Sequence, residues 1–181
     1  TVAAIAGCSS GASDMGEIEQ ICRSLVSSVG DDRKWFQEWV RMADRLQKNA
    51  ESERKKGHNL TAASFYKRSS NYYQMADRFK FPKDKRALNI YKESIKCFKN
   101  FAKLTDSPEL EVVNIPFEKK KKLPAYFVPA VGSKKTKSPV VVLYNGFDGT
   151  KEMSFHWAAD AFTRRGMNCL IVDSPGVGES I

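Results

Sequence analysis

An apolar segment that runs directly into a turn bounded by two glycines constrains this chain more than any other feature. Residues 140–144, Val-Val-Val-Leu-Tyr, are typical of a buried strand, and Gly146 and Gly149 allow the backbone to turn sharply. Thr150 or Lys151 then begins a helix. The predicted packing face of that helix consists of Trp157, Ala158, Ala161 and Phe162. The pattern therefore predicts a strand, a tight turn and a helix in direct succession.

The tip of this turn carries the predicted catalytic groups. Between the two glycines, the backbone N–H groups of Phe147 and Asp148 are expected to point into a cleft. The loss of one such preorganised donor to an oxyanion costs about 3 kcal/mol in well-studied enzymes. A second role for the Asp148 side chain is to hold the turn, and the two roles are compatible. The sequence thus predicts an oxyanion hole at Phe147 and Asp148, with Gly146 and His156 as substrate-binding neighbours.

Composition sets the broad class of the protein. The 181 residues are 41% hydrophobic and 28% charged, which suits a soluble globular chain with one sizeable core or two small ones. No run approaches the roughly 18 apolar residues of a membrane span. The first six residues are too short, and lack the basic flank, for a secretory signal. We therefore expect a cytoplasmic protein with no membrane partner.

Four cysteines stand far apart in the sequence. Cys8, Cys22, Cys97 and Cys169 show neither the close spacing of zinc ligands nor the pattern of a disulfide framework. Reduced and mostly buried thiols are the simpler interpretation. The sequence therefore predicts no structural metal and no disulfide.

The net charge of +9 comes mainly from one region. Seven lysines fall between Lys119 and Lys137 with no acidic residue among them. The first four of these lysines separate two strand-like segments, as a solvated hairpin connection would. The region lacks the interleaved aromatic and arginine residues that favour specific nucleic-acid binding. A nucleic-acid partner is therefore not expected, and nucleic-acid binding ranks third among the functions considered.

The first half of the chain has a helical pattern. From about residue 15 to residue 104, apolar residues recur every three or four positions. Gly57 and Phe81-Pro82 divide this stretch into three helices. Tyr72 and Tyr73 are adjacent and are not expected to face the core together, so one of them is a candidate for the pocket or for an interface. Both are therefore candidate substrate-binding residues. The other aromatic residues of interest are Trp35, Trp39, Phe65 and Tyr66. The prediction is a small helical bundle, with a repeat array as the minor alternative.

From residue 111 the pattern changes from helix to strand. Two strands flank the lysine loop, a third covers residues 140–145, and a fourth covers residues 167–173 after a helix that Gly166 ends. The third and fourth strands are expected to be parallel, joined by a right-handed crossover. Residues 173–180 then leave the carboxyl end of the fourth strand, where ligands bind in such sheets. This predicts a helical domain at 1–110 and an α/β domain at 111–181.

Two short motifs invite other functions. Ser9 lies in a GxSxG frame at residues 7–11, but a nucleophile elbow must follow several strands of one sheet, and none is predicted before it. Residues 173–176 resemble a GTPase switch segment, but the sequence contains no GxxxxGK[ST] phosphate loop. The favoured interpretation of residues 7–11 is a flexible segment, and that of residues 173–176 is a turn at the end of a strand.

Several motifs together resemble one subgroup of the α/β-hydrolase superfamily, in which a helical domain precedes the core. The subgroup includes the bacterial dihydroxypseudooxynicotine hydrolase and fungal hydrolases that shorten polyketide chains. The matching segments are residues 14–17, 34–39, 57–58, 61–63, 70–73, 114–117, 123–127, 145–152 and 173–178. The resemblance covers nearly the whole chain in the family's order, and it implies an N-terminal helical cap followed by the first part of an α/β-hydrolase sheet.

The resemblance also implies an activity. Members are serine hydrolases that cleave a C–C bond next to a ketone in aromatic or polyketide substrates, without a metal or organic cofactor. Their serine, acid and histidine come after the fourth strand, so they have no matching positions here. The chain is thus expected to be the N-terminal portion of a longer enzyme of secondary metabolism, inactive alone. A small-molecule partner and a homodimer are further expectations.

Two alternatives stay open. The same machinery would hydrolyse an ester or a thioester, because the leaving group is not visible in these residues. The other alternative belongs to a different functional class and is a non-catalytic helical binding module with a vestigial sheet. That reading is less favoured, because a partial sheet is expected to expose a long hydrophobic edge at its last strand.

Overall fold

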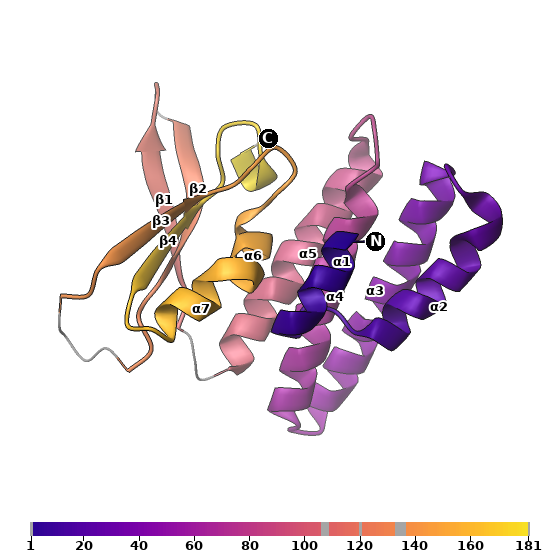
Figure 1. The fold of residues 1–181 in the computed structure, drawn as a ribbon, viewed down its shortest axis with the longest axis horizontal. Coiled ribbons are helices and arrows are strands. Elements are labelled where there is room, and N and C mark those ends of the chain that lie inside the picture. Colours follow the sequence, from indigo (N-terminus) through magenta and orange to yellow (C-terminus); the bar gives the residue numbers. More distant parts are fainter. Residues whose placement is uncertain (1, 106–108, 120, 133–136, 181) are drawn as a thin grey trace. The chain divides into compact units, whose positions relative to one another are not determined.

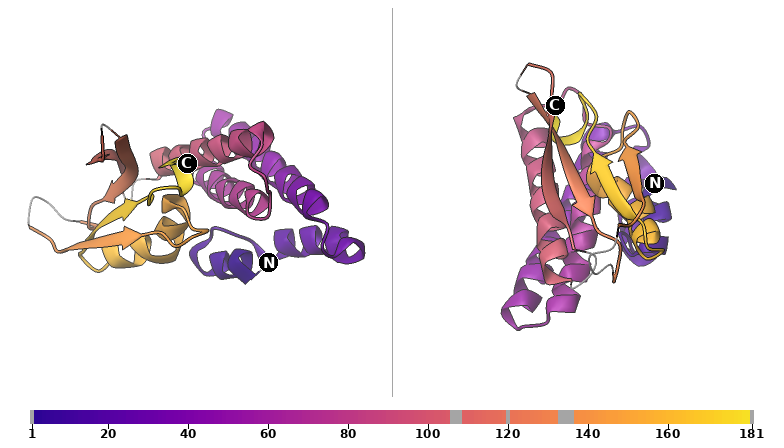
Figure 2. Two further views of the ribbon diagram at one scale, coloured as in Figure 1. Left: turned by 90° about the horizontal axis from the view of Figure 1, so that it is seen from above. Right: turned by 90° about the vertical axis from the view of Figure 1, so that its left-hand side faces the viewer.

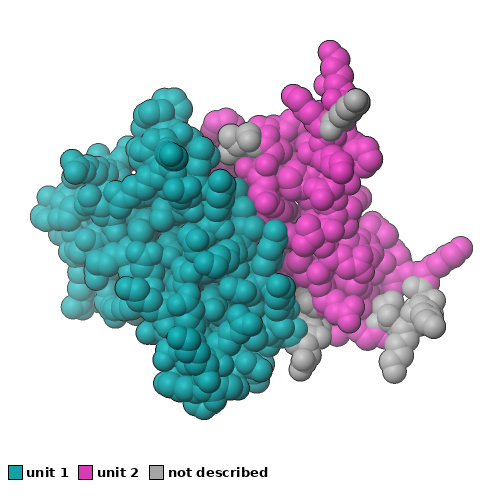
Figure 3. All heavy atoms as spheres, turned by 180° about the vertical axis from the view of Figure 1, so that it is seen from behind, with its two compact units in different colours: residues 1–105 teal, residues 106–181 magenta. Residues whose placement is uncertain are grey.

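The computed structural model describes residues 2–105, 109–119, 121–132 and 137–180. The chain forms two compact units, residues 1–105 and 106–181 (Figure 3). This division lies close to the domain boundary predicted after residue 110. Three lysines of the predicted basic region, Lys120, Lys134 and Lys135, lie outside the described residues.

The first unit is helical, as predicted (Figure 1). Its α-helices are α1 (Val2–Ala6), α2 (Met15–Leu25), α3 (Asp32–Lys55), α4 (Asn59–Asp77) and α5 (Lys85–Leu104). Short 3₁₀ turns follow α1 at Gly7–Ser10 and α2 at Val26–Ser28. Helix α4 packs against both α3 and α5. The unit is therefore a small bundle in which α4 is the central long helix.

Aspartate side chains fix the starts of three helices. Asp14, Asp31 and Asp84 precede α2, α3 and α5, and each accepts a hydrogen bond from the backbone N–H three residues later. Such a cap stabilises a helix by about 1 kcal/mol, because it satisfies an N–H that has no partner inside the helix. Gly57, with a φ of 82°, follows the end of α3 in the left-handed conformation. Local sequence signals thus set the helix boundaries.

Tyr72 and Tyr73 are both buried, so the prediction that they do not share the core is wrong. The physical reason is that α4 is covered on more than one side. The Tyr72 hydroxyl donates to Glu17 Oε2 at 2.8 Å, and the Tyr73 hydroxyl donates to Asp44 Oδ1 at 2.6 Å. Burial is the main cause that raises the pKa of both hydroxyls. Their contact with a substrate stays a prediction.

The second unit contains a four-stranded sheet in the order β1-β2-β4-β3. The strands are β1 (Glu111–Phe117), β2 (Lys121–Val128), β3 (Val140–Tyr144) and β4 (Asn168–Val172). Strands β1 and β2 form an antiparallel hairpin, and β2 is also antiparallel to β4. Strands β3 and β4 are parallel, which confirms the prediction. The helical segment between them packs against β4 (Figure 2).

The order of the strands corrects two predictions. The last strand, β4, is not at the edge but lies between β2 and β3. The edge strand β3 was predicted to be buried, yet its Tyr144 side chain is 70% exposed, and Val140 and Val142 are about half exposed. Hydrophobic periodicity identifies a strand but carries no information on its neighbours in the sheet.

The helical segment that follows the turn also differs from the prediction. It consists of α6 (Lys151–Ser154), a π-helical turn (Phe155–Ala159) and α7 (Asp160–Thr163). Trp157 is 50% exposed and Ala161 is exposed, although both were assigned to the packing face. The buried residues are Lys151, Glu152, Met153, Phe155, His156, Ala159 and Thr163. A π-helical turn has a wider repeat than an α-helix, so it rotates the buried face away from the position that α-helical spacing predicts.

All four cysteines are free thiols: Cys97 and Cys169 are buried, and Cys8 and Cys22 are half-buried. Burial raises the pKa of Cys97 to about 12. At about pH 8 only about one such thiol in ten thousand is ionised. We expect iodoacetamide to spare Cys97 in the folded protein and to alkylate it in urea, as measured by peptide mass spectrometry. Rapid native alkylation of Cys97 would contradict the burial.

Candidate functional site

The predicted oxyanion turn is a β-turn between β3 and α6. The Gly149 N–H donates to the Gly146 carbonyl at 3.3 Å, which places Phe147 and Asp148 at the two central positions. The turn's own hydrogen bond uses neither of their N–H groups. Phe147 is 99% exposed, and Asp148 is exposed as well. Thr150 then caps α6, because its Oγ1 accepts the Met153 N–H at 3.3 Å.

The two glycines serve a different purpose from the one predicted. Neither Gly146 nor Gly149 has a left-handed φ, so the backbone conformation does not require glycine at either position. A Cβ built at Gly146 would meet no atom within 4 Å. The absent side chain therefore leaves the surface beside the turn open.

A buried ion cluster lies directly behind the turn. Lys151, the first residue of α6, is fully buried, and its Nζ lies 2.8 Å from Asp173 Oδ2, 3.0 Å from Glu152 Oε1 and 2.6 Å from Glu179 Oε2. Burial works against the ammonium charge, but the attraction of the three carboxylates outweighs it and raises the pKa of Lys151. The side chain is therefore charged at neutral pH. Our sequence reasoning missed this cluster.

Asp173 is the centre of the cluster. Its Oδ1 accepts hydrogen bonds from Asn145 Nδ2 and from the Lys151 backbone N–H, both at 2.8 Å. Its Oδ2 accepts from Lys151 Nζ at 2.8 Å and from the Glu179 backbone N–H at 3.0 Å. Burial raises the pKa of Asp173, Lys151 opposes that shift, and Glu152 adds to it. Four donors thus converge on one buried side chain at the carboxyl end of β4.

Two further contacts complete the cluster. The Tyr126 hydroxyl donates to Glu152 Oε1 at 2.8 Å, and Lys151 Nζ lies 4.9 Å from the centre of the Tyr126 ring. Gly178, with a φ of 60°, lies so close that a Cβ at this position would overlap the Asp173 carboxylate. A glycine is therefore required where the 173–180 loop passes the aspartate. The signal that could have revealed the cluster is an adjacent Lys-Glu pair at the start of a core-facing helix.

The remaining predicted site residues belong to two different units of the chain. His156 is buried in the π-helical turn. The centres of its ring and of the Phe155 ring are 5.6 Å apart, and the two rings are nearly perpendicular. Tyr72 and Tyr73 belong to the helical unit. Gly146, Phe147 and Asp148 come together in the β-turn itself. Contact of the other three residues with a substrate stays a prediction.

Ser9 does not have the environment of a nucleophile elbow. It lies in the 3₁₀ turn after α1, and its Oγ donates to the Ala6 carbonyl at 2.9 Å. Within the described residues, no strand precedes it. The segment predicted to be flexible is thus a 3₁₀ turn in the structure.

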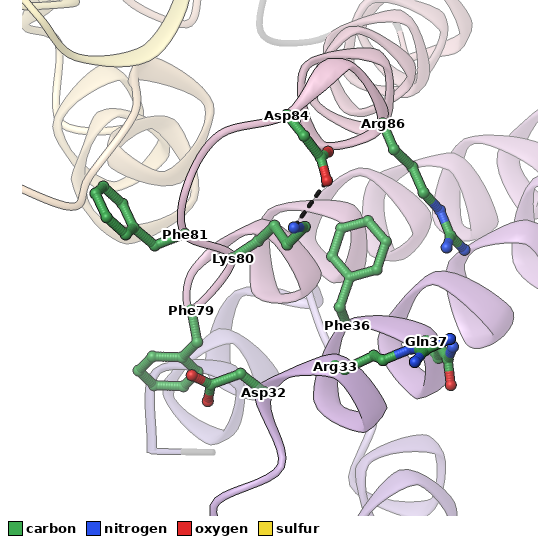
Figure 4. Close-up of a pocket in the computed structure, with 9 residues that line it drawn as sticks. All are labelled: Asp32, Arg33, Phe36, Gln37, Phe79, Lys80, Phe81, Asp84 and Arg86. Carbon is green, nitrogen blue, oxygen red and sulfur yellow. Dashed lines mark ion pairs between the residues drawn. The ribbon is translucent and has the colours of Figure 1, made fainter.

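Two of the surface cavities formed by the described residues lie in the helical unit. One, of about 290 Å³, is lined by residues at the starts of α3 and α5. The ion pair between Lys80 and Asp84 forms part of its wall (Figure 4). The other, of about 400 Å³, is more apolar and is lined by Trp35 and Phe79 among others. Trp35 thus lines a cavity within the helical unit. The described part of the chain contains no group of three His, Cys, Asp or Glu residues placed to hold a metal.

A protein-family model described as "Esterase FrsA-like" matches residues 23–181. The chain belongs to this family. The predicted resemblance to α/β-hydrolases with an N-terminal helical domain is thereby confirmed. Among the described residues, no helix of this FrsA-like chain has both the length and the apolar character of a membrane span.

Fungal hydrolases are similar in sequence. The chain is 31% identical to the alpha/beta hydrolase xenA of Xenoacremonium sinensis, over 94% of this chain and 40% of the relative. It is also 31% identical to the 20-hydroxy-prefusarin hydrolase FUS2 of Gibberella moniliformis, over 82% of this chain and 36% of the relative. The chain thus spans about 40% of the length of the curated relatives it matches.

A solved structure is similar in fold. The crystal structure of 2,6-dihydroxy-pseudo-oxynicotine hydrolase matches with a TM-score of 0.73 at 22% identity, over 96% of this chain and 46% of that one. The match covers both the helical region and the sheet. The fold is therefore a helical N-terminal region followed by part of an α/β-hydrolase sheet, as predicted.

Gly178 offers a test of the cluster. Gly176→Ala and Gly178→Ala both place a side chain at a positive φ, which costs about 1–2 kcal/mol. Only the alanine at position 178 would also meet the Asp173 carboxylate, and overpacking adds about 1–3 kcal/mol. We expect Gly178→Ala to lower the thermal midpoint of the full-length protein clearly more than Gly176→Ala. Equal midpoints would argue against the close approach of the loop to Asp173.

Proposed function

We propose that the full-length protein is a serine-type hydrolase that cleaves a C–C bond next to a ketone in an aromatic or polyketide substrate. The observation that carries the proposal is the exposed β-turn at Gly146–Gly149, which follows a parallel strand and is anchored to a buried ion cluster. Membership of the FrsA-like family supports hydrolysis. The names of FUS2 and of the 2,6-dihydroxy-pseudo-oxynicotine hydrolase support a small organic substrate.

The turn would act on the charge that develops during the reaction. A serine outside the given chain attacks the ketone carbon, and the carbonyl oxygen becomes an oxyanion that accepts hydrogen bonds from the N–H groups of Phe147 and Asp148. The C–C bond then breaks, and its electron pair leaves on a carbon that is stabilised as an enolate and takes up a proton. Water hydrolyses the acyl-enzyme to a carboxylic acid. No step requires a metal or an organic cofactor.

The exposed edge strand β3 is an argument for a larger sheet in the full-length protein. Among the described residues, strand β3 has a neighbouring strand on one side only, and it exposes Tyr144, Val140 and Val142. Natural proteins usually cover such edges. We propose that a further strand pairs with β3, and that the nucleophilic serine follows it on a strand-to-helix elbow. The predicted homodimer and the predicted cytoplasmic location stay predictions.

Ester or thioester hydrolysis is the second candidate, and the esterase description of the family favours it. Both reactions share the oxyanion and the acyl-enzyme and differ in the leaving group. The non-catalytic binding module is less favoured, because the chain shares its family with hydrolases along most of its length.

The oxyanion role can be tested without disturbing the turn. Proline suits the second position of a β-turn and has no N–H, so Phe147→Pro should keep the fold and remove one donor. We expect kcat to fall about 10²–10³-fold. The matched control, Phe147→Ala, removes the exposed ring but keeps the N–H, and should change kcat only slightly. An unchanged kcat in a correctly folded Phe147→Pro variant would refute the oxyanion role.

The leaving group can be tested separately. We expect the full-length enzyme to convert an aryl β-diketone into a carboxylic acid and a methyl ketone, with a higher kcat/KM than for an aryl ester of the same acyl group. Product analysis by mass spectrometry distinguishes the two reactions. Efficient turnover of the ester alone would establish the esterase alternative and leave the oxyanion turn in place.

A further inference from the structure

The oxyanion turn is held at both ends by one oxygen atom. Asn145, the residue before the turn, donates from Nδ2 to Asp173 Oδ1 at 2.8 Å. Lys151, just after the turn, donates its backbone N–H to the same oxygen at 2.8 Å. Asp173 Oδ1 therefore closes the loop 145–151 into a ring that contains the β-turn. The exposed tip is thereby tied to a fully buried carboxylate.

The second oxygen of Asp173 fixes the carboxylate itself. Oδ2 accepts from Lys151 Nζ at 2.8 Å and from the Glu179 N–H at 3.0 Å, so the carboxylate is held by the start of α6 and by the segment after β4. Its plane is restrained further by Gly178, since only a residue without a Cβ fits beside it. An acceptor held at four points cannot turn away from the loop that it closes.

Asn145 is the link that can be removed without breaking the ion cluster. It is half-buried and uncharged, and its Oδ1 accepts a hydrogen bond from Ser154 Oγ on α6. One side chain thus joins the end of β3 to the Asp173 carboxylate and to the helix after the turn. Its loss would leave all contacts of Lys151 with the three carboxylates in place.

We propose that Asn145 is a positioning residue for the oxyanion turn, acting through Asp173, which Lys151 holds in place. This inference rests on the proposed function and adds to it the groups that orient the N–H donors. Oxyanion donors work because they are fixed before charge develops, so a turn that moves by a fraction of an ångström stabilises the transition state less. Asn145 contacts no reacting atom, and its effect is transmitted through the backbone.

The test compares two single deletions of side-chain hydrogen bonds in the full-length enzyme. Asn145→Ala removes the link at the turn, and Tyr126→Phe removes the bond to Glu152 on another side of the cluster. We expect Asn145→Ala to lower kcat about 10–100-fold with little change in KM. Tyr126→Phe leaves all four hydrogen bonds of Asp173 in place and should therefore lower kcat clearly less than Asn145→Ala. Asn145→Asp keeps the shape but loses the donor and adds a like charge beside Asp173, so it should behave like Asn145→Ala.

Combination with Phe147→Pro separates positioning from general stability. If Asn145 acts through the Phe147 N–H, Asn145→Ala should cost clearly less in the Phe147→Pro background than in the wild type. Full additivity of the two losses would overturn the positioning role. A loss of kcat in Phe147→Pro but not in Asn145→Ala would also overturn it, and would leave the proposed function standing. No loss in Phe147→Pro would instead remove the oxyanion function itself.

A readout that needs no substrate completes the design. The Lys151 amide is buried and bonded to Asp173, so it should exchange its hydrogen slowly. We expect Asn145→Ala to speed exchange in the peptide 145–151 at least about tenfold, while Tyr126→Phe leaves it near the wild-type rate. Unchanged exchange in Asn145→Ala would show that Asn145 does not hold the turn, and would overturn the inference whatever the substrate is.

Discussion

The buried ion pair of Asp173 with Lys151 is the interaction on which the rest of the α/β unit depends. Asp173 ends β4, and Lys151 begins the helical segment that follows β3, so the pair ties two neighbouring parallel strands together at their carboxyl ends. Removal of one partner from a buried ion pair costs about 3–5 kcal/mol, because the other charge is left without compensation. The turn after β3 and the segment after β4 are therefore constrained by the same charges.

This arrangement combines a rigid base with an exposed tip. Phe147 extends into solvent, whereas Lys151, four residues later, is fully buried. Stabilisation of an oxyanion needs this combination, because the donors must reach a ligand and yet be immobile before charge develops. Its place at the carboxyl end of parallel strands also agrees with where open α/β sheets bind ligands.

Much of the fold could be predicted from the sequence, because its signals are local. Gly57, the Phe81-Pro82 pair and the spacing of apolar residues located the long helices, and the strand-turn-helix order located the β-turn at Phe147. The errors arose where burial depends on distant neighbours. Tyr72 and Tyr73 share the core because α4 has helices on two sides, and Trp157 turns outward because a π-helical turn rotates the buried face.

The sequence by itself determined the element types, the parallel pair of strands, the family and the residues at the tip of the turn. Only the tertiary structure decided that β3 is an edge, that neither glycine of the turn needs a left-handed conformation, and that Lys151 is buried among three carboxylates. The physical reason is that a charged side chain is stable inside a protein only when partners remote in sequence surround it, and Asp173 and Glu179 reach Lys151 only through the pairing of β3 with β4.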